Sequence, residues 1–347
     1  METTVRTADR TWSGIISALL NGHNLSADDA WWAMDEVVGG TATSAQVSGF
    51  LVALRAKGET PEEIAGLAEA LRRHATPIAI PGPFVDIVGT GGDGTGAVNI
   101  STMAAIVAAS TGVTVVKHGG RAASSTTGGS ADLVEHLGIP LDLTPSAVLR
   151  AVAAAGITYL FAPRFNPGLR HVAAVRRELA VPTAFNVLGP LINPADPRHQ
   201  LVGVADARMQ PVIASVLAAR GGSALVVRGE DGLDKLTTTT SSRVWVVRGG
   251  TTSEVLVDPR ELGIPLCSSS DLRGGDAATN ARIARSVLEG EPGPVRDVVL
   301  LNAAAAVATV GLTGEPLVEQ LAGWLERCVH AVDSGLAAAT LERWIKA

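Results

Sequence analysis

The sequence predicts an α/β protein in which a small helical domain precedes a larger domain built on a mostly parallel sheet. Residues 12–74 carry only helical patterns, in short amphipathic segments separated by the turn-forming clusters N-G-H-N, V-G-G-T and K-G-E-T. From Pro77 onwards, short apolar runs alternate with helical segments, and residues 295–347 are expected to form two or three helices. These observations divide the chain into a helical domain, residues 1–75, and an α/β domain, residues 76–347.

Capping residues mark where two of the N-terminal helices begin. Ser26 stands just before a pair of aspartates, and Thr60 is followed by a first-turn proline and by Glu63 at the capping-box position. The apolar faces of these helices are expected to form core or dimer surface rather than a ligand-binding box. They include Trp31, Trp32, Phe50 and Leu51.

Eight short apolar runs in the larger domain are expected to form strands. They are residues 85–88, 113–116, 159–161, 184–186, 201–203, 224–228, 244–247 and 252–257. Helices are expected between several of these runs. One starts at Thr144-Pro145, and another begins at Pro211 and ends at the R-G-G sequence.

Composition excludes several classes of protein. The chain has 347 residues, of which 46% are hydrophobic and 18% charged, and its formal charge of −6 with no basic block argues against nucleic acid or an acidic membrane as principal partner. Cys267 and Cys328 lie far apart, so we expect neither a zinc site nor a disulfide, which fits a reducing cytoplasm. The N-terminus does not resemble a secretory signal, and the longest apolar stretches are interrupted and too short to span a bilayer. We therefore expect a soluble protein.

A glycine-rich segment between an apolar run and an alanine-rich helix is the most informative part of the sequence. It reads D-I-V-G-T-G-G-D-G-T-G-A-V-N-I-S-T from Asp86 to Thr102, which predicts a strand, a glycine loop and a helix in that order. Glycines let the backbone turn its N–H groups toward a ligand, and the N-terminus of the following helix carries a positive dipole end. The segment is therefore expected to bind an anion such as a phosphate.

Two other interpretations of this segment are less favourable. A plain flexible turn would not need the polar side chains of Asp93, Asn99 and Ser101. A dinucleotide site would fit the G-x-G-x-x-G spacing of the first glycines, but residues 108–113 contain no Asp or Glu to bind a ribose.

Three further segments carry residues suited to chemistry. Residues 117–132, K-H-G-G-R-A-A-S-S-T-T-G-G-S-A-D, combine cations, hydroxyls and glycines and form either a second phosphate site or a solvated loop. Residues 159–179 set Arg176 near the end of a strand, where it either has a role or is simply solvated. Asp231 and Asp234 lie in a turn and could hold a hydrated magnesium ion, although acid-bearing turns are common.

Taken in order, these motifs resemble the anthranilate phosphoribosyltransferase family. The pattern runs D-I-V-G-T-G-G-D-G…N-I-S-T, K-H-G-x-R…S-S…G, F-A-P-R-F…V-R-R-E-L, F-N-x-L-G-P-L-x-N-P and G-L-D-x-L-T, and it extends from the N-terminal helices to about Trp344. The resemblance implies a fold of the nucleoside phosphorylase/phosphoribosyltransferase type, with part of residues 165–185 joining the helical domain. It also implies a cytoplasmic homodimer with its site in the cleft between the domains.

The family activity would move the 5-phosphoribosyl group from phosphoribosyl pyrophosphate to the amine of an aromatic acid, with magnesium, in tryptophan biosynthesis. Pyrophosphate would leave, so the site must neutralise departing charge and position an amine rather than offer a nucleophile. On matching positions, the residues that would hold the donor are Gly92, Asp93, Asn99, Ser101, Thr102, Lys117, Ser124 and Ser125. Gly89 and Arg176 would face the acceptor, with Arg176 pairing with its carboxylate. Ser101 and Asp234 would contact the metal, and Lys117 and Arg176 would be the catalytic residues.

The sequence departs from the family pattern within the expected cleft. Gly120 replaces an asparagine and Asn166 replaces a histidine, so these two positions are expected to reshape the acceptor site. The acceptor is therefore anthranilate or a related aromatic acid. Lys235 replaces a glutamate, and an ammonium cannot ligate magnesium. Either one metal is lost and Lys235 neutralises phosphate, or catalysis is impaired, or the lysine points to solvent. Smaller departures are Ala97 and an extra small residue near Gly129.

Two alternative functions remain at this stage. The altered metal motif could belong to a binding protein that has lost turnover, and a nucleoside phosphorylase would share the general fold. The V-R-R-E-L, F-N-V-L-G-P-L and N-I-S-T motifs fit the transferase better.

Overall fold

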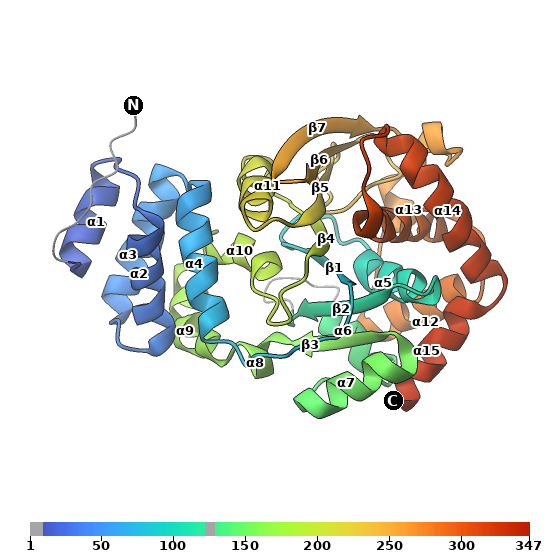
Figure 1. Cartoon of the computed structure of the whole chain (residues 1–347), viewed down its shortest axis with the longest axis horizontal. Helices are drawn as coiled ribbons and strands as arrows, with labels where there is room; N and C mark the ends of the chain where they lie inside the picture. The colour runs from blue at the N-terminus through green and yellow to red at the C-terminus, as the bar shows by residue number, and fades with distance from the viewer. Residues whose placement is uncertain (1–9, 122–128) are drawn as a thin grey trace.

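The N-terminal helices begin where the sequence places their caps. The computed structural model describes residues 10–121 and 129–347, and its helical domain contains α1 (Trp12–Leu20), α2 (Ala27–Gly39), α3 (Ser44–Lys57) and α4 (Pro61–Arg73) (Figure 1). The Ser26 hydroxyl accepts a hydrogen bond from Asp29 N at 3.1 Å. Thr60 and Glu63 form a reciprocal capping box at the start of α4. Both predicted helix starts are confirmed.

A seven-stranded sheet forms the centre of the second domain, in the order β3-β2-β1-β4-β5-β6-β7. The strands are β1 (Phe84–Gly89), β2 (Thr114–Gly119), β3 (Ile157–Phe161), β4 (His199–Gly203), β5 (Ser223–Gly229), β6 (Ser242–Arg248) and β7 (Thr251–Val257). The five strands from β3 to β5 in this order are parallel, and β6 and β7 add an antiparallel hairpin at one edge. The expected mostly parallel sheet is confirmed.

One predicted strand is wrong. Residues 184–186 lie at a short helix, α10 (Phe185–Leu188), instead of in the sheet. Local bonds fix the turn, because Asn186 N donates to Thr183 O at 2.9 Å and the Asn186 side chain accepts from Thr183 N at 3.0 Å. A short run with only two buried apolar residues, Ala184 and Phe185, does not distinguish a strand from a helical turn.

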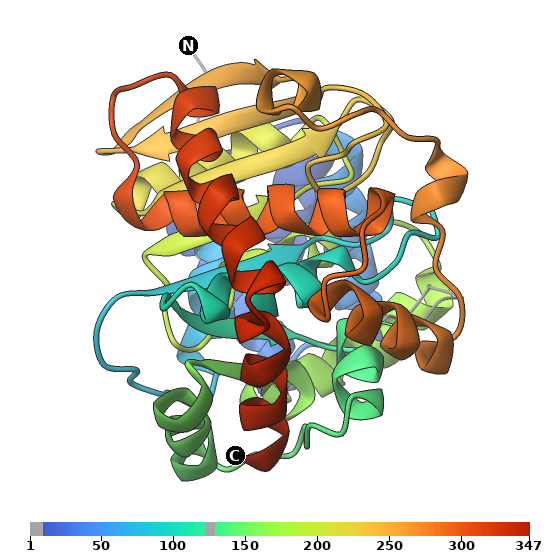
Figure 2. The ribbon, with the colours of Figure 1, turned by 90° about the vertical axis from the view of Figure 1, so that its right-hand side faces the viewer.

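Helices cover both faces of the sheet over two large cores, and a smaller cluster that includes Val116, Leu160 and Phe165 lies beside β2 and β3. The right-hand face in Figure 1 carries α5 (Ile100–Ser110), α6 (Ser130–His136), α7 (Pro145–Ala155), α12 (Ala277–Leu288), α13 (Pro294–Ala308), α14 (Leu317–Asp333) and α15 (Leu336–Lys346). The C-terminal helices of this layer cross in front of the sheet in Figure 2. The opposite face carries α11 (Met209–Ala219), whose core is continuous with that of the helical domain.

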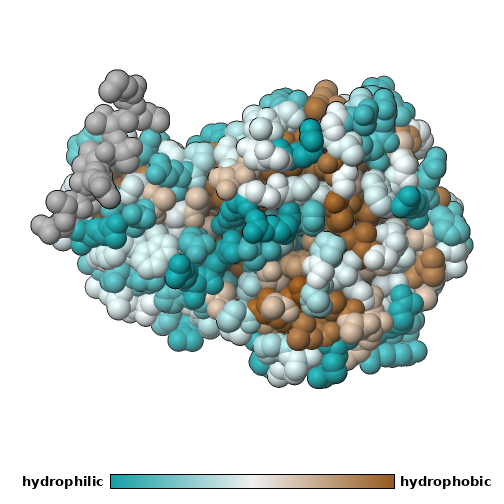
Figure 3. All heavy atoms as spheres, viewed as in Figure 1, coloured by the Kyte–Doolittle hydropathy of each residue, from teal (hydrophilic) through white to brown (hydrophobic). Residues whose placement is uncertain are grey.

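The helical domain is completed by a segment from the middle of the chain. After α8 (Ala162–Phe165), the helix α9 (Arg170–Leu179) packs against α2 and α3 (Figure 1). On the face seen in Figure 3, hydrophilic side chains gather over α10 and the loop that follows it, close to the junction of the two domains.

Within residues 10–121 and 129–347, one helix is long and apolar enough to cross a membrane by length and composition alone. It corresponds to Pro294–Gly311, and 67% of that window is buried inside the protein. Because α13 packs against α5 and α14 on the covered side of the sheet, we interpret it as a core helix.

Candidate functional site

The carboxyl end of β1 opens directly into the glycine loop, which leads to the N-terminus of α5. Ligands of open α/β sheets bind outside the carboxyl ends of parallel strands, and β1 lies in the middle of the parallel set. Four loop glycines, Gly91, Gly92, Gly94 and Gly96, have φ values of 66° to 78°. This left-handed backbone strongly favours glycine and lets successive N–H groups face one side. The predicted order of strand, glycine loop and helix is confirmed.

Backbone hydrogen bonds to neighbouring segments anchor the glycine loop at both ends. Thr90 N donates to Gly203 O at 2.9 Å, and Gly274 N donates to Gly96 O at 2.9 Å. Within the loop, one oxygen of Asp93 accepts from Thr95 N and from the Thr95 hydroxyl, both at 3.0 Å. The loop is therefore held in shape by the chain itself.

Polar side chains follow the loop at the start of α5. Asn99 Oδ1 accepts from Asn280 Nδ2 at 3.0 Å, and its side chain makes no capping bond to the helix. Ser101 and Thr102 are both buried. In the described part of the chain, the Thr102 hydroxyl has no hydrogen-bond partner. The first N–H groups of α5 thus lack a side-chain cap, as expected of a helix N-terminus that receives an anion.

The turn after β5 is pressed against the loop. Gly91 N donates to Asp234 Oδ2 at 2.7 Å, and the Lys235 ammonium pairs with Asp234 Oδ1. A Cβ atom on Gly203 would lie 1.5 Å from the Asp234 carbonyl oxygen, and one on Gly89 would lie 2.3 Å from Asp234 Oδ2. Only glycine at the ends of β1 and β4 allows this approach.

The two acids of this turn have different surroundings. Asp231 accepts from the hydroxyls of Thr237 and Thr239, at 2.8 and 2.5 Å, so its carboxylate stabilises its own turn. Asp234 faces the glycine loop, and its backbone N lies 3.4 Å from Asp93 Oδ2.

Buried charges lie beneath the loop. The Lys117 ammonium on β2 donates to Ile87 O at 2.5 Å, and burial lowers the pKa of Lys117 to about 8. On β1, Asp86 accepts from Asn193 Nδ2 at 3.0 Å and from His118 N at 3.3 Å. Burial raises the pKa of Asp86 to about 6, against the opposing effect of Lys117.

His118 and Asn166 form a second buried contact. His118 Nε2 lies 2.9 Å from Asn166 Oδ1, and Asn166 Nδ2 donates to Ile192 O at 3.3 Å. Burial lowers the pKa of His118 to about 4, so the ring is neutral near pH 7. Because an amide oxygen only accepts, the proton is assigned to Nε2. Both polar atoms of the Asn166 amide are therefore engaged within the protein.

Arg176 and Gly120 mark the expected acceptor side. Arg176 lies on α9, half-buried, with its guanidinium 5.4 Å from the centroid of the Phe185 ring, and burial lowers the pKa of Arg176. It forms no ion pair with any residue that the structure describes, so its charge is available to a carboxylate. Among the residues that the structure describes, a Cβ atom on Gly120 would meet only the Ala162 side chain, at 3.8 Å, so these residues leave space there.

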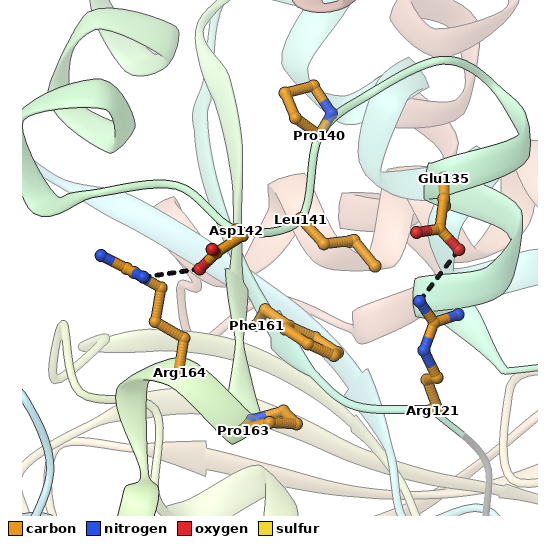
Figure 4. Close-up of a pocket in the computed structure, with 8 residues that line it drawn as sticks. All are labelled: Arg121, Glu135, Pro140, Leu141, Asp142, Phe161, Pro163 and Arg164. Carbon is orange, nitrogen blue, oxygen red and sulfur yellow. Dashed lines mark hydrogen bonds and ion pairs between the residues drawn. The ribbon is translucent and has the colours of Figure 1, made fainter.

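An open pocket of about 690 Å³ adjoins this region (Figure 4). Arg121, which follows Gly120, pairs with Asp132 at 2.5 Å and with Glu135 at 2.9 Å, and Arg164 pairs with Asp142 at 2.5 Å on the other side. Apolar side chains lie between the two arginines; they are Pro140, Leu141, Phe161 and Pro163. Both arginines are already paired with carboxylates, and the pocket offers apolar surface between two ion pairs.

The described residues fit a magnesium ion only if it is carried by a ligand. No group of three or more His, Cys, Asp or Glu among them could hold a metal ion. Both oxygens of Asp234 already have partners, Gly91 N and the Lys235 ammonium. Magnesium commonly keeps several waters and binds through one or two carboxylates plus substrate phosphates. A resident metal does not fit, whereas an ion that arrives on a phosphate ligand does.

The structure brings most of the predicted donor residues together, and it adds residues that sequence reasoning missed. The glycine loop, the start of α5 and the Asp234 turn meet at one edge of the sheet. Ser124 and Ser125 lie outside the described residues. The missed residues are Asp86, Asn193 and Gly203. An aspartate inside the apolar run V-D-I-V was the one available signal, because a lone charge in a buried strand requires partners.

Comparison with known proteins first defines the class. The description "Glycosyl transferase family, helical bundle domain" matches residues 13–75, and "Glycosyl transferase family, a/b domain" matches residues 81–338. The chain is thus built as a glycosyl transferase with a helical bundle and an α/β domain.

Relatives and solved structures narrow this class. Anthranilate phosphoribosyltransferases of Salinispora arenicola and Streptomyces griseus are each 56% identical, over 97% and 98% of this chain and 97% and 96% of theirs. The structure of the Thermus thermophilus enzyme aligns with a TM-score of 0.89 at 40% identity, covering 96% of this chain and 98% of that one. The Saccharomyces cerevisiae enzyme in complex with PRPP and Mg aligns with a TM-score of 0.86 at 30% identity, covering 98% of each. This chain belongs to the anthranilate phosphoribosyltransferase family, which confirms the resemblance and the fold class expected from the sequence.

Proposed function

We propose that this enzyme transfers the 5-phosphoribosyl group from phosphoribosyl pyrophosphate to the amine of anthranilate and releases pyrophosphate. The observation that carries the proposal is the meeting of the glycine loop, the uncapped start of α5 and the Asp234 turn, in a chain 56% identical to named anthranilate phosphoribosyltransferases. The relatives do not favour the readings as a binding protein without turnover or as a nucleoside phosphorylase. The product would enter tryptophan biosynthesis in the cytoplasm.

The donor would lie across the glycine loop. Its diphosphate would accept hydrogen bonds from the loop at Gly92 and from the first turn of α5 at Ser101 and Thr102, with Asp93 and Asn99 contacting the remainder of the donor. Ser124 and Ser125 are proposed donor contacts on the motif alone. Lys117 supports binding from below, since its ammonium is bonded to Ile87 O and contributes positive potential to the loop.

The chemistry requires charge stabilisation more than a reactive side chain. As pyrophosphate leaves, the ribose carbon becomes cationic and negative charge accumulates on the departing group, which the loop N–H groups and Lys117 stabilise. Magnesium bound to the diphosphate would neutralise part of the same charge. Its proposed protein contacts are the Ser101 hydroxyl and the Asp234 carboxylate. Each Asp234 oxygen accepts one bond, from Gly91 N or from Lys235, and keeps a second acceptor position for an ion that arrives on the donor.

The acceptor would bind on the side of α9. We place its carboxylate against Arg176, which the described residues leave without an ion pair, and its ring near Gly89 and Gly120. Asn166 would influence the acceptor site indirectly. Its amide is bonded to His118 and to Ile192 O, so it would position His118 rather than contact the acceptor. The open space at Gly120 would admit anthranilate with room for a ring substituent.

We also propose that the enzyme is a homodimer through its helical domain, formed by residues 1–75 and part of 165–185, with the remainder of 76–347 as the donor-binding domain. Leu20 on α1 and Val52 on α3 are 72% and 45% exposed on neighbouring helices, which supports an apolar contact there. Light scattering after gel filtration should give twice the chain mass, and a monomer mass would overturn this.

Pyrophosphate release tests the function. The enzyme should release pyrophosphate from phosphoribosyl pyrophosphate and magnesium when anthranilate is added, and aniline, which lacks the carboxylate, should not replace it. Ring-substituted anthranilates would report the space at Gly120. Absence of turnover with every aminobenzoate, despite donor binding, would contradict the proposal and favour a binding protein.

A further inference from the structure

Lys235 is an unusual residue to find beside a loop that is proposed to bind a diphosphate with magnesium. It follows Asp234 in the turn after β5, where the family pattern has a glutamate. Its side chain is 18% exposed and that of Asp234 is 1% exposed, so the two charges are largely removed from water. A lysine that only pointed to solvent would be far more exposed. The ammonium therefore belongs to the site.

The ammonium of Lys235 has hydrogen-bonding capacity left over. An ammonium carries three N–H donors, and one of them is used on Asp234 Oδ1. Within the described part of the chain, no other hydrogen bond or ion pair of Lys235 is formed. A Cβ atom on Gly89 would lie 3.3 Å from Lys235 Nζ, which places the ammonium at the base of the glycine loop. A nearly buried cation with unused donors at an anion site is positioned to meet an anion.

Charges of both signs surround the Lys235 ammonium. Asp93 favours its charged form and Lys117 opposes it, so all three charges are near the loop. Asp234 is held by Gly91 N and by the ammonium, which leaves its charge locally neutralised. With a carboxylate at position 235, two adjacent acids would face a diphosphate, and divalent ions would be needed to offset the repulsion. With a lysine at position 235, no divalent ion is needed there to offset this repulsion.

We propose that Lys235 is a cation built into the donor site, which neutralises Asp234 and donates hydrogen bonds to a diphosphate oxygen of the donor where a glutamate would recruit a metal ion. The inference rests on the proposed function, since it assumes that the donor binds at the glycine loop. It assigns a binding role to a residue that departs from the family pattern. The donor complex consequently needs one divalent ion fewer than a complex of the Lys235→Glu variant.

Donor affinity and ion count test this directly, without turnover. Calorimetric titration with phosphoribosyl pyrophosphate would compare the parent with Lys235→Met and Lys235→Arg, at limiting and at saturating magnesium. Loss of charge-assisted hydrogen bonds should weaken donor binding to Lys235→Met by about tenfold or more at limiting magnesium, with Lys235→Arg retaining most of the affinity. Manganese, counted by electron paramagnetic resonance in the donor-saturated protein, should show one additional bound ion in Lys235→Glu.

Each outcome has a distinct meaning. Donor binding by Lys235→Met that matches the parent at limiting magnesium, or an unchanged ion count in Lys235→Glu, would overturn the role of Lys235 and leave the proposed function standing. Failure of the parent to bind the donor at all would overturn the proposed function itself. If Lys235→Met does not fold, Lys235→Gln, which keeps a polar side chain without the charge, provides the same comparison.

Discussion

Two lysines at the same edge of the sheet have different partners: Lys117 is buried, and Lys235 is largely removed from water. Burial lowers the pKa of each to about 8. Lys117 lies on a strand and donates to a backbone carbonyl, whereas Lys235 lies on a turn and pairs with the carboxylate of Asp234. Lys117 is bonded to a carbonyl and interacts electrostatically with the buried Asp86, whereas Asp234 pairs with Lys235 directly and leaves two of its donors unused. The comparison shows that a lysine can act in two ways at one site. Lys117 contributes positive electrostatic potential, and Lys235 is positioned to donate hydrogen bonds to the donor.

The largest expected effect is the loss of Lys117. Lys117→Met should lower kcat/KM by about 100-fold, because a positive charge beneath the leaving group is lost in the transition state. The variant should also be less stable, because it leaves the nearby buried carboxylate of Asp86 without the opposing charge of Lys117. Steady-state kinetics and urea denaturation of the same variant would measure both quantities.

A matched control for this prediction lies in the helical domain. Lys57 is also buried and pairs with Glu63 at 2.9 Å, away from the glycine loop. Lys57→Met should destabilise the protein by about 3 kcal/mol, because it leaves a buried carboxylate unpaired, and should leave donor affinity unchanged. If Lys117→Met kept its activity and lost only stability, as expected for Lys57→Met, the proposed role of Lys117 in the donor site would be contradicted.

The next effect concerns the turn that carries Lys235. Gly203→Ala should push the Asp234 turn off the end of β4, since the added Cβ would overlap the Asp234 carbonyl oxygen. We expect donor affinity to fall by about tenfold and the free energy of unfolding by about 1–3 kcal/mol. Gly189→Ala is the control, because no described residue lies within 4 Å of a Cβ at that position. Equal donor affinities of the two variants would argue against a donor role of the turn.

A third variant tests whether the acceptor side of the cleft is separate from the donor side, where the two lysines lie. Arg176→Gln should raise the KM for anthranilate by about tenfold or more through the loss of a carboxylate pair, with the donor Kd unchanged. Arg177→Gln, at the next and exposed position, should affect neither constant. A weakened donor Kd in Arg176→Gln would show that the two sides of the cleft are not separate.

The smallest effect is a change in pH dependence. The pKa of His118 is lowered from 6.5 to about 4, so its contribution to stability is complete above pH 6.5 and is lost as the pH falls toward 4. In His118→Gln this loss should be absent. The difference in unfolding free energy between parent and variant should therefore change by up to about 1.4 kcal/mol per pH unit in that window, in favour of the variant at low pH. Urea denaturation between pH 6.5 and pH 4 would measure it, and a constant difference would contradict the burial of a neutral ring.

The effect of Asp86 on stability has the opposite pH dependence to that of His118. For this reason His118→Gln is compared with the parent at each pH. Its raised pKa contributes stability below pH 3.8, and this contribution is lost as the pH rises to about 6. Because Asp86 is present in both proteins, its effect largely cancels in the difference.

The sequence was sufficient to locate the parts of the site that depend on local order. The glycine loop and α5 could be predicted because strand, glycine and helix signals follow one another within residues 84–102. Lys235 stood out because it breaks a motif. The bond between Asp86 and Asn193 could not be predicted, because it joins residues 107 positions apart and depends on the tertiary fold. Gly203 escaped notice for the same reason, since its role is visible only when the Asp234 turn lies against β4.

In the fold as well, features set by neighbouring residues could be predicted from the sequence, and features set by tertiary contacts could not. Caps at Ser26 and Thr60 fix helix starts through neighbours three residues away. The packing of α9 on α2 and α3 depends on a return of the chain to the helical domain. Residues 184–186 failed as a strand because their apolar pattern suits both a buried strand and the turn of α10.

The central claim is that the left-handed glycine loop binds the donor diphosphate. Calorimetric titration of phosphoribosyl pyrophosphate with magnesium into the parent and into Gly92→Val tests it most directly, because valine strongly disfavours the φ of 78° at this position. The account predicts saturable binding of one donor per chain to the parent and binding at least about tenfold weaker to a folded Gly92→Val. Equal affinities of the two proteins, or no heat of binding to the parent, would contradict it.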